Sequence, residues 1–451
     1  MIATESVSKH TKDYLARYSR TYDNAPRSRF HTFVAIASAG GDFSDGYVLG
    51  TIGIALTLAR GPLRLDAIWM GLLGAASLAG LFFGSLFLAP FADRIGRRPF
   101  LASTMAVFSA ISIVQFFVTT SWQLLWLRFA LGLVLGIDYV VCCTIVAEFS
   151  PLSSRGRLLS LLTVMWTVGY CTAFLVGTFL TEINSHAWRW LLLSSAIPSA
   201  AIFFVRLAIP ESPPWLVQRG RAEEARAIID RHIGSDVALP VITPTKPQST
   251  MSQWTELLGP RYRRRTAIGV IFFTALVIPY FALGTFVPVV FGALGISNAL
   301  ISGAIFNVFM VLGSVFGFWF VDRIPRRTFL VVSFYVSAAT LALLAMRLTL
   351  LPSVTVAVAS AFAFVLAAAT VLCFVYPPEL FPTRLRASGV GISVSSSRVG
   401  SAGSTFLLPI LVESIGIRSS LGICVGVLLL GGIACQIYAP ETRGMAMESL
   451  N

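Results

Sequence analysis

The sequence has very little charge for its length. Charged residues make up 12% of the 451 residues, hydrophobic residues make up 56%, and the mean hydropathy is +0.78. A soluble domain carries roughly 25% charged residues. The scarcity of charge therefore excludes a soluble globular protein, and the long apolar runs predict a membrane protein.

Residues suited to catalysis and metal binding are also scarce. The four histidines lie at or beyond the ends of the apolar segments, where they form no metal cluster and no nucleophile–base arrangement. The six cysteines fall within apolar segments without metal-ligand spacing, and we interpret them as small packing residues. No glycine-rich phosphate loop ending in Lys-Ser/Thr is present. The sequence thus predicts neither an enzyme nor an ATP-driven pump, with no cofactor and no metal site.

The net charge of +13 is placed along the chain in a way that indicates topology. Most of the 34 Lys and Arg residues fall in the two tails and in alternate loops. The opposite loops contain only Arg60, Arg64, Arg189, Arg347 and Arg418, and the apolar segments contain only Arg128, Arg206 and Arg398. This asymmetry is the positive-inside bias of membrane proteins. We therefore expect both termini to be cytoplasmic and expect no nucleic-acid partner.

Twelve apolar segments, each near the ~20 residues that span a bilayer as a helix, follow one another along the chain. They lie at about 31–58, 67–92, 99–120, 122–147, 158–182, 188–209, 266–291, 297–320, 328–346, 353–376, 387–413 and 416–439. The predicted fold is an all-α membrane protein with twelve transmembrane helices in two six-helix halves. The predicted parts are an N-terminal tail (1–29), an N-terminal half (30–209), a cytoplasmic linker loop (210–265), a C-terminal half (266–439) and a C-terminal tail (440–451).

A short basic turn occurs twice, about half the chain length apart. Residues 91–101 read Phe-Ala-Asp-Arg-Ile-Gly-Arg-Arg-Pro-Phe-Leu, and residues 320–330 read Phe-Val-Asp-Arg-Ile-Pro-Arg-Arg-Thr-Phe-Leu. A second pair repeats at nearly the same offset, because Glu148 with Arg155 recurs as Glu379 with Arg386. Matching charged turns in two halves of an apolar chain indicate an internally duplicated membrane protein.

Several short motifs occur in an order that is specific when they are taken together. They are Asp-Gly-Tyr at 45–47, Asp-Arg-Ile-Gly-Arg-Arg at 93–98, Arg128 with Gly132 and Gly136, Asp138-Tyr139, Glu148 with Arg155-Gly-Arg157, Pro-Glu-Ser-Pro at 210–213, Asp322 to Arg327, Glu379 to Arg386, and Pro-Glu-Thr-Arg-Gly at 440–444. In these motifs the chain resembles the major facilitator superfamily, and within it the sugar-porter-like bacterial metabolite:proton symporters of the inner membrane. The chain departs from the family pattern at Ala89, Val48 and Pro325.

The resemblance implies a secondary transporter in which two halves rock around a central site. In this family, charge clusters at the cytoplasmic face hold the inner gate closed while the protein faces outward. The corresponding residues here are Asp93, Arg94, Arg97, Arg98, Glu148, Arg155 and Arg157 in the first half, and Asp322, Arg323, Arg326, Arg327, Glu379 and Arg386 in the second. Static topology charge with helix capping is the alternative interpretation.

Ionisable residues inside the apolar segments are costly in hydrocarbon and usually face a cavity. Asp42 and Asp45 lie one turn apart on the first segment, and Arg128 and Asp138 lie on the fourth. The resemblance implies that the aspartate of the first helix and the arginine of the fourth couple proton movement to the conformational change. The proton carrier stays open among Asp45, Asp138 and Asp42, in that order, and a structural salt bridge is the alternative.

Arg398 is a further interior charge, near the middle of the eleventh segment. Because the second half has no acid at that depth, a substrate carboxylate or phosphate is a suitable partner for its guanidinium. Pairing with Asp138 or Asp45 across the halves is the alternative. Other candidates for substrate contact, each of which packing also explains, are Tyr139, Trp166, Tyr170, Tyr280, Asn307 and Tyr376.

The sequence favours a proton symporter of a small organic or sugar acid, working by alternating access in the cell inner membrane. The expected partners are a small-molecule substrate, protons and the lipid bilayer, and one chain contains a complete pathway, so a monomer is expected. A sugar or polyol transporter working by symport or uniport is the alternative, and a transporter-like sensor that does not transport is a third possibility.

Overall fold

The structure is a computed structural model that describes the chain apart from residues 1–17, 182–185, 241–249, 347–350, 382–384 and 443–451. The side chains of Asp93 and Arg386 also lie outside the described part. Within the described residues the chain is helical without a β-strand, and one isolated parallel bridge joins Arg20 and Val237.

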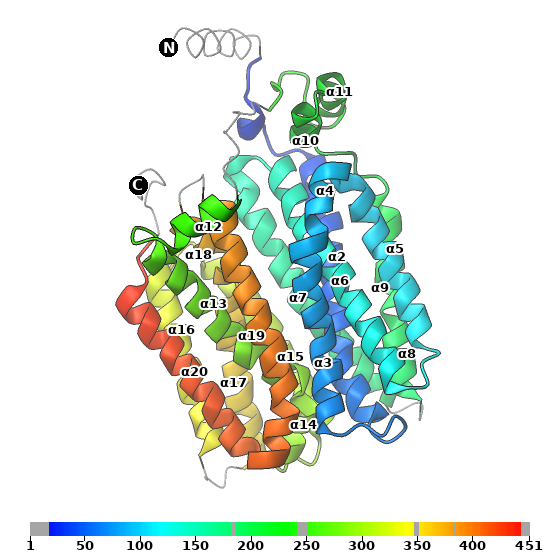
Figure 1. Cartoon of the computed structure of the whole chain (residues 1–451), viewed down its shortest axis with the longest axis vertical. Coiled ribbons are helices and arrows are strands. Elements are labelled where there is room, and N and C mark those ends of the chain that lie inside the picture. Colours follow the sequence, from blue (N-terminus) through cyan, green and yellow to red (C-terminus); the bar gives the residue numbers. More distant parts are fainter. Residues whose placement is uncertain (1–17, 182–185, 241–249, 347–350, 382–384, 443–451) are drawn as a thin grey trace.

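Each of the twelve expected spans is occupied by one helix or by consecutive helices (Figure 1). The first six spans correspond to α2 (Arg29–Ala59), α3 (Ala67–Phe83) with the π-helix η2 (Gly84–Leu88) and α4 (Ala89–Ile95), α5 (Arg97–Gln115), α6 (Ser121–Phe149), α7 (Leu152–Thr181), and α8 (Ala187–Ser194) with α9 (Ala196–Arg206). The second six correspond to α13 (Arg263–Thr285) with α14 (Val287–Ala293), α15 (Ala299–Phe320), α16 (Arg326–Ala345), α17 (Pro352–Thr370) with α18 (Leu372–Leu380), α19 (Arg386–Ile415) and α20 (Ile417–Tyr438). The predicted all-α fold is confirmed, and helices occupy all twelve of the predicted spans.

Within the described residues, nine helical segments are long and apolar enough to cross a membrane by themselves. The spans formed by α2, α5 and α19 are not among them. Polar residues reduce their hydropathy: α2 contains Asp42 and Asp45, α5 begins with Arg97, and α19 contains Arg398 and many serines. These three less apolar helices are therefore the ones expected to have a function in addition to spanning the membrane.

Short polar side chains fix where several helices begin. Ser28 and Thr120 form capping boxes with His31 and Gln123 at the first turns of α2 and α6. Asp66 accepts a hydrogen bond from the backbone N–H of Trp69 at the start of α3, over 2.8 Å. Such caps satisfy backbone donors that have no partner inside the helix.

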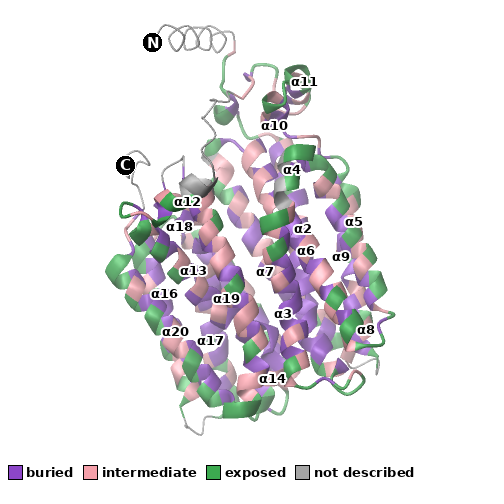
Figure 2. Cartoon of the chain, in the orientation of Figure 1, coloured by how far each residue is buried: buried purple, intermediate pink, exposed green. Residues whose placement is uncertain are grey.

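The two ends of the bundle differ in what they carry. Both ends of the described chain and the helices α10 (Pro213–Gln218), α11 (Ala222–His232) and α12 (Thr250–Leu258) lie at one end, which we call the linker end (Figure 1). We call the opposite end, with α8 and α14, the far end (Figure 1). Buried residues fill the middle of the bundle, and exposed residues gather on α11 and along the outer helix faces (Figure 2). The exposed helix α11 thus lies at the linker end, outside the bundle.

Helices of the two halves approach most closely near the far end. A side chain at Gly53 of α2 would meet the carbonyl oxygen of Thr285 of α13, and one at Gly71 of α3 would meet that of Phe406 of α19. Glycine is needed at these crossings because the backbones leave no room for a Cβ atom. The two halves are therefore closed against each other at the far end.

The segment before α2 packs on the linker helices. Tyr22 and Ala25 form an apolar cluster with Ile229 of α11 and with Val237. The ring of His232 stacks on Phe30, with 4.2 Å between ring centroids. Burial, and then the neighbouring Arg231, lower the pKa of His232, so the stacked imidazole is neutral at physiological pH. The predicted linker loop thus contains the helix α11, and residues 18–28 of the predicted N-terminal tail are packed on it.

Candidate functional site

A buried ion pair joins two helices of the first half. Arg206 at the end of α9 holds Asp138 of α6 with two hydrogen bonds, Nη1 to Oδ1 over 2.5 Å and Nη2 to Oδ2 over 3.1 Å. Neither side chain is exposed, each having 0% of its side-chain surface accessible. A bidentate arrangement between planar groups is the strongest geometry available to an arginine and a carboxylate. Asp138 therefore has a full counter-charge inside the first half.

Polar neighbours complete this pair, which we call the Asp138–Arg206 network. The hydroxyl of Thr104 donates to Asp138 over 2.5 Å, and Arg206 also donates to the carbonyl oxygen of Leu101 over 2.9 Å. The sulfur of Cys142 lies 2.8 Å from Arg206 Nη2, so this cysteine is more than a packing residue. A side chain at Gly41 of α2 would collide with Arg206. The network thus ties α2, α5, α6 and α9 together.

Sequence reasoning missed the role of Arg206. The residue was visible as a charge inside an apolar segment, but its partner lies on another helix, and sequence spacing cannot show which helices are neighbours. The expected alternative pairing of Asp138 with Arg398 is not formed. The sequence signal that could have identified Arg206 is that a buried Asp138 carboxylate needs a buried cation as its partner.

The expected contact between Asp45 and Arg128 is not formed in this structure. Both terminal nitrogens of Arg128 donate to the backbone carbonyl oxygen of Val48, each over 3.2 Å. Among the described residues Arg128 contacts no carboxylate, and its Nε is buried without a partner. Val48 follows Asp45 by three residues, which is about 4.5 Å along the helix axis. Arg128 therefore lies about one helical turn from the carboxylate expected to meet it.

The two aspartates of α2 are buried with few partners. Asp42 and Asp45 are 2% and 1% exposed. Neither carboxyl oxygen of Asp45, nor Oδ2 of Asp42, has a hydrogen-bond partner among the described residues. A buried ionised carboxylate without a hydrogen bond is costly, and such a group takes up a proton instead. In this conformation the carboxyl of Asp45 is suited to the neutral form.

A cavity of about 70 Å³ lies between the two halves. It is lined by Asp42 and Leu49 of α2, Leu81 of α3, Leu135 and Tyr139 of α6, Thr163, Trp166 and Thr167 of α7, Phe273, Val277, Tyr280 and Phe281 of α13, Thr370 of α17, Cys373 of α18 and Arg398 of α19. Ligand pockets usually measure 300–1,000 Å³. In this structure the cavity is therefore smaller than the pockets that usually hold a small-molecule ligand.

Arg398 is the cation of this central cavity. Its guanidinium lies over the ring of Tyr139, 5.1 Å from the ring centroid, in a cation–π contact across the two halves. Its Nε is buried without a hydrogen-bond partner, and no described carboxylate lies within ion-pair distance of its side chain. The structure thus places a buried arginine at the cavity with its hydrogen-bonding capacity largely unused.

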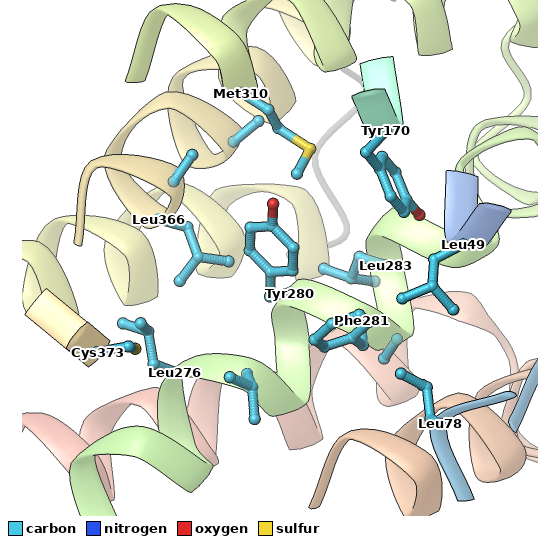
Figure 3. Packing of buried hydrophobic residues seen from close by; sticks show 14 of the residues in the cluster. Leu49, Leu78, Tyr170, Leu276, Tyr280, Phe281, Leu283, Met310, Leu366 and Cys373 are labelled. Carbon is cyan, nitrogen blue, oxygen red and sulfur yellow. The ribbon is translucent and has the colours of Figure 1, made fainter. Parts of the chain in front are cut away.

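Aromatic rings form much of the cavity wall. The ring of Trp166 stacks on Tyr170 with centroids 5.5 Å apart, and it lies 6.1 Å from the ring of Tyr280 and 5.9 Å from that of Phe281. Figure 3 shows Tyr280 and Phe281 between Leu366 and Cys373 on one side and Leu49 on the other. A side chain at Gly46 of α2 would meet the carbonyl oxygen of Trp166, so the close crossing of α2 and α7 sets the position of this wall.

Four of the seven residues proposed for substrate contact line the cavity, namely Tyr139, Trp166, Tyr280 and Arg398. Tyr170 lies behind Trp166 as its stacking partner. Asn307 of α15 is fully buried, and its amide donates to the carbonyl oxygen of Gly303 over 2.8 Å. Tyr376 of α18 donates to the carbonyl oxygen of Pro440 over 2.8 Å, near the linker end. The structure gives Asn307 and Tyr376 packing contacts away from the cavity.

A charge cluster stands at the linker end of the first half. Arg97 at the start of α5 pairs with Glu148 at the end of α6 over 3.0 Å. The carboxylate of Glu211 accepts hydrogen bonds from the backbone N–H groups of Arg97 and Arg98, over 3.1 and 3.2 Å. Glu211 thus caps α5 with a negative charge, which the positive end of the helix dipole favours.

The second half repeats this cluster. Arg326 at the start of α16 pairs with Glu379 of α18 over 3.4 Å, and Glu441 accepts from the backbone N–H groups of Arg326 and Arg327 over 2.8 and 3.0 Å. Asp322 is a further partner of Arg326 at 3.0 Å. Each cluster joins helices of one half, so the repeated sequence motifs form the same arrangement twice.

The remaining residues predicted for the gate are mostly exposed. Arg155 pairs with Asp23 over 3.2 Å, which links α7 to the segment before α2. Arg94, Arg157, Arg323 and Arg327 are exposed at the linker end. Asp93 and Arg386 have side chains outside the described part of the chain.

The two copies of the basic turn differ in backbone conformation at the position where Gly96 is replaced by Pro325. Gly96 has a φ of 125°, a conformation that favours glycine, whereas Pro325 begins α16 with a φ of −55°.

Two six-helix halves, closed against each other at one end around a central cavity, define a membrane transporter of the major facilitator fold. Residues 32–451 match the family model described as "Sugar (and other) transporter". The chain therefore belongs to the sugar (and other) transporter family.

Individual relatives agree with this assignment. The chain is 38% identical over 430 residues to the inner membrane metabolite transport protein YgcS of Escherichia coli (strain K12), covering 94% of this chain and 95% of YgcS. It is 35% identical over 432 residues to the putative metabolite transport protein YaaU of the same organism, covering 95% and 96%. The partially occluded inward-open structure of the xylose transporter XylE from E. coli matches with a TM-score of 0.76 at 19% identity, covering 93% of this chain and 100% of that chain. This last likeness shows the fold.

Proposed function

We propose that this protein is a secondary transporter that moves a small organic acid together with protons by alternating access. The observation that carries the proposal is Arg398, a buried cation at the cavity between the halves with no acid partner among the described residues. A substrate carboxylate satisfies this guanidinium with two parallel hydrogen bonds. Binding the acid then removes the cost of an unpaired charge in the membrane interior.

Proton coupling is assigned to the aspartates of α2, with Asp45 first and Asp42 second. Among the described residues Asp45 has no hydrogen-bond partner, and Arg128 is about one helical turn away. A shift of α2 against α6 by about this distance brings the two groups together, and the ion pair favours loss of the proton. One conformation thus binds the proton and the other releases it.

Asp138 is less suited to carry the proton. Arg206, Thr104 and Cys142 all contact its carboxylate, and Arg206 is held in turn by carbonyl oxygens of α2 and α5. Breaking a buried ion pair by removing one charge is strongly unfavourable. We therefore assign the Asp138–Arg206 network to holding the first half together as one unit.

The two charge clusters at the linker end are assigned to the cytoplasmic gate. Each holds the start of one helix against its neighbours, through Arg97, Glu148 and Glu211 in the first half and Arg326, Glu379 and Glu441 in the second. Rigid ends of this kind allow the halves to rock as units instead of unravelling. We propose that the two halves, 30–209 and 266–439, are the units that rock.

The positive-inside bias supports a multi-pass protein of the cell inner membrane with the linker end in the cytoplasm. The arginine-rich start of α13, with Arg263, Arg264 and Arg265, lies at this end. The whole cavity is formed by one chain, so we propose that a monomer transports. With the linker end in the cytoplasm, the closed far end at the opposite side of the bundle is the periplasmic end.

A sugar transporter is the second candidate, because one solved structure with a matching fold is a xylose transporter. The two functions separate in a binding experiment with the purified protein. Thermal unfolding is followed with organic acids, sugar acids, phosphate and neutral sugars at two pH values, since a ligand of the folded state raises the melting temperature. Stabilisation by an acid that is lost in Arg398→Ala supports the proposal. Stabilisation by a neutral sugar that survives this substitution overturns it.

A further inference from the structure

A groove lies on the surface of the second half, between the start of α13 and the end of α20. Its volume is about 430 Å³, and its lining residues are Arg263, Arg264, Ala267, Ile268, Ile271 and Tyr438. None of these residues lines the central cavity. The groove is therefore a separate feature, and what it binds does not depend on what the protein transports.

The groove opens away from the centre of the bundle. An α-helix turns by about 100° per residue, so Ile271 points almost opposite to Phe273, which lines the central cavity from two residues further along α13. On α20, Ile433 and Ile437 next to the groove are 45% and 56% exposed. Exposed apolar side chains on a membrane-spanning helix face the acyl chains of lipids. This side of the second half thus faces the bilayer.

The groove changes from charged to apolar along α13. Arg263, Ala267 and Ile271 follow one another at intervals of four residues, so they lie on roughly one face of the helix. All three are exposed. The distance along the helix axis from the cation to the last apolar side chain is about 12 Å. A molecule with a charged head and an apolar tail matches this order.

The charged end of the groove is held in place by contacts between the two helices. Arg264 lies over the ring of Tyr438, 5.0 Å from the ring centroid, and donates to the carbonyl oxygen of Ile437 over 3.2 Å. Neither Arg263 nor Arg264 forms an ion pair with a carboxylate of the described part of the chain. The first turn of α13 has no acidic residue, and the positive end of the helix dipole adds to its charge. A phosphate group is a suitable partner for these two arginines.

The corresponding place in the first half is covered by protein. The spans of α2 and α9 begin and end that half, as the spans of α13 and α20 begin and end the second. At the start of α2, the ring of His232 from α11 stacks on Phe30, and the hydroxyl of Ser28 donates to the carbonyl oxygen of His232 over 3.3 Å. At the start of α13, by contrast, Arg263 and Arg264 are exposed. The groove of the second half is thus the place where a ligand from the membrane has access.

We propose that the groove binds one anionic phospholipid from the leaflet at the linker end. Its phosphate contacts Arg263 and Arg264, and one acyl chain lies along Ala267 and Ile271. Anionic headgroups are concentrated at the membrane surface, where basic residues attract them. A free phosphate leaves the apolar part of the groove without a partner, and a lipid without net charge leaves the two arginines without one.

The test measures lipid binding to the purified full chain in detergent, as a rise in melting temperature and as retained lipid in native mass spectrometry. Three probes separate the parts of the ligand. Phosphatidylglycerol carries the anion and the acyl chains, phosphatidylcholine with the same chains has no net charge, and glycerol phosphate has the anion without chains. We expect phosphatidylglycerol to bind more than about ten-fold more tightly than the other two, because each arginine near the membrane surface contributes about a factor of five.

Substitutions locate the site. Arg263→Gln removes a cation that has no described partner, and we expect it to weaken phosphatidylglycerol binding about five-fold. The double variant Arg263→Gln/Arg264→Gln weakens this binding by more than about ten-fold. Arg231→Gln is the control, because it removes one charge from the exposed side of α11, outside the bundle, and it binds the lipid as the wild type does. If the double variant does not fold, the single variant Arg263→Gln decides the question.

Four results overturn the proposal. They are equal binding of phosphatidylcholine, stabilisation by glycerol phosphate at the concentration at which phosphatidylglycerol acts, unchanged lipid binding in folded Arg263→Gln, and an equal loss of binding in Arg231→Gln. The second result identifies a site for a free anion, and the last identifies a general effect of net charge. None of the four bears on the proposed transport of an acid, which depends on the central cavity.

Discussion

Asp138 and Arg206 form a bidentate ion pair between α6 and α9, with both side chains completely buried. The pair places two charged groups inside a bundle of mostly apolar helices. The Asp138 carboxylate is thus fully partnered, whereas both oxygens of Asp45 and Oδ2 of Asp42 have no hydrogen-bond partner among the described residues. In the proposed mechanism the Asp138–Arg206 pair is therefore structural, and Asp45 and Asp42 are the candidates for proton coupling.

Removing the arginine of this pair destabilises the protein. Arg206→Met leaves the Asp138 carboxylate in the interior with only Thr104 and Cys142 as partners, and an uncompensated buried charge costs about 3–5 kcal/mol. We expect the melting temperature of the detergent-solubilised protein to fall by several degrees. The double variant Arg206→Met/Asp138→Leu removes both charges and recovers much of this loss. A single variant as stable as the wild type contradicts the assignment.

Neutralising Asp45 uncouples transport from protons. Asp45→Asn keeps the size of the side chain but cannot release a proton, so we expect substrate exchange across the membrane without stimulation by a pH gradient. Proteoliposomes measure both activities, as counterflow and as gradient-driven uptake. Asp42→Asn is the matched control on the same helix, with a smaller effect on the pH profile. An unchanged pH profile in Asp45→Asn makes Asp45 a structural residue.

The two caps at the linker end accept equivalent hydrogen bonds, so we expect them to contribute similar free energies. Glu211→Ala and Glu441→Ala each remove an acceptor of two backbone N–H groups at a helix start, and the loss of such a cap costs about 0.5–2 kcal/mol. We expect both variants to lower the melting temperature by similar amounts and to slow transport. Glu224→Ala is the control, because its ion pair with Arg221 lies in solvent and contributes little. Unequal effects of the two cap variants argue against a repeated function.

A larger residue at the far-end crossing blocks the conformational cycle. Gly53→Leu places a side chain against the carbonyl oxygen of Thr285, so the halves no longer close at that end. We expect normal insertion and folding but no net transport. Gly61→Leu is the control, because nothing lies within 4 Å of a side chain at that position. Full transport by Gly53→Leu shows that this crossing is not part of the closed gate.

The sequence predicted the number and order of the spans because hydropathy is a local property. It did not predict that several spans consist of two consecutive helices, joined at Ser195, Phe286 and Val371, since apolar residues continue through each junction. The charged turns were also recognised, but the roles of Glu211 and Glu441 as caps depend on contacts between segments far apart in sequence.

Side-chain direction explains which of the predicted residues lie at the central cavity and which do not. Arg398, which the sequence places near the middle of the eleventh segment, lies at a cavity between the halves, and so does Trp166. Arg206 was missed, and Tyr376 was assigned to the cavity although it faces Pro440, because depth does not specify which way a helix is rotated. Rotation is set by packing against neighbours that only the structure shows.

The most direct test of the central claim is uptake of a labelled acid into proteoliposomes, with and without an imposed proton gradient. The acid is the one that most strongly stabilises the purified protein, and protein-free liposomes measure passive diffusion. The account predicts accumulation that requires the gradient in the wild type, and uptake no faster than passive diffusion in Arg398→Ala. Accumulation of the acid by Arg398→Ala at the wild-type rate, or gradient-driven uptake of a neutral sugar instead, contradicts it.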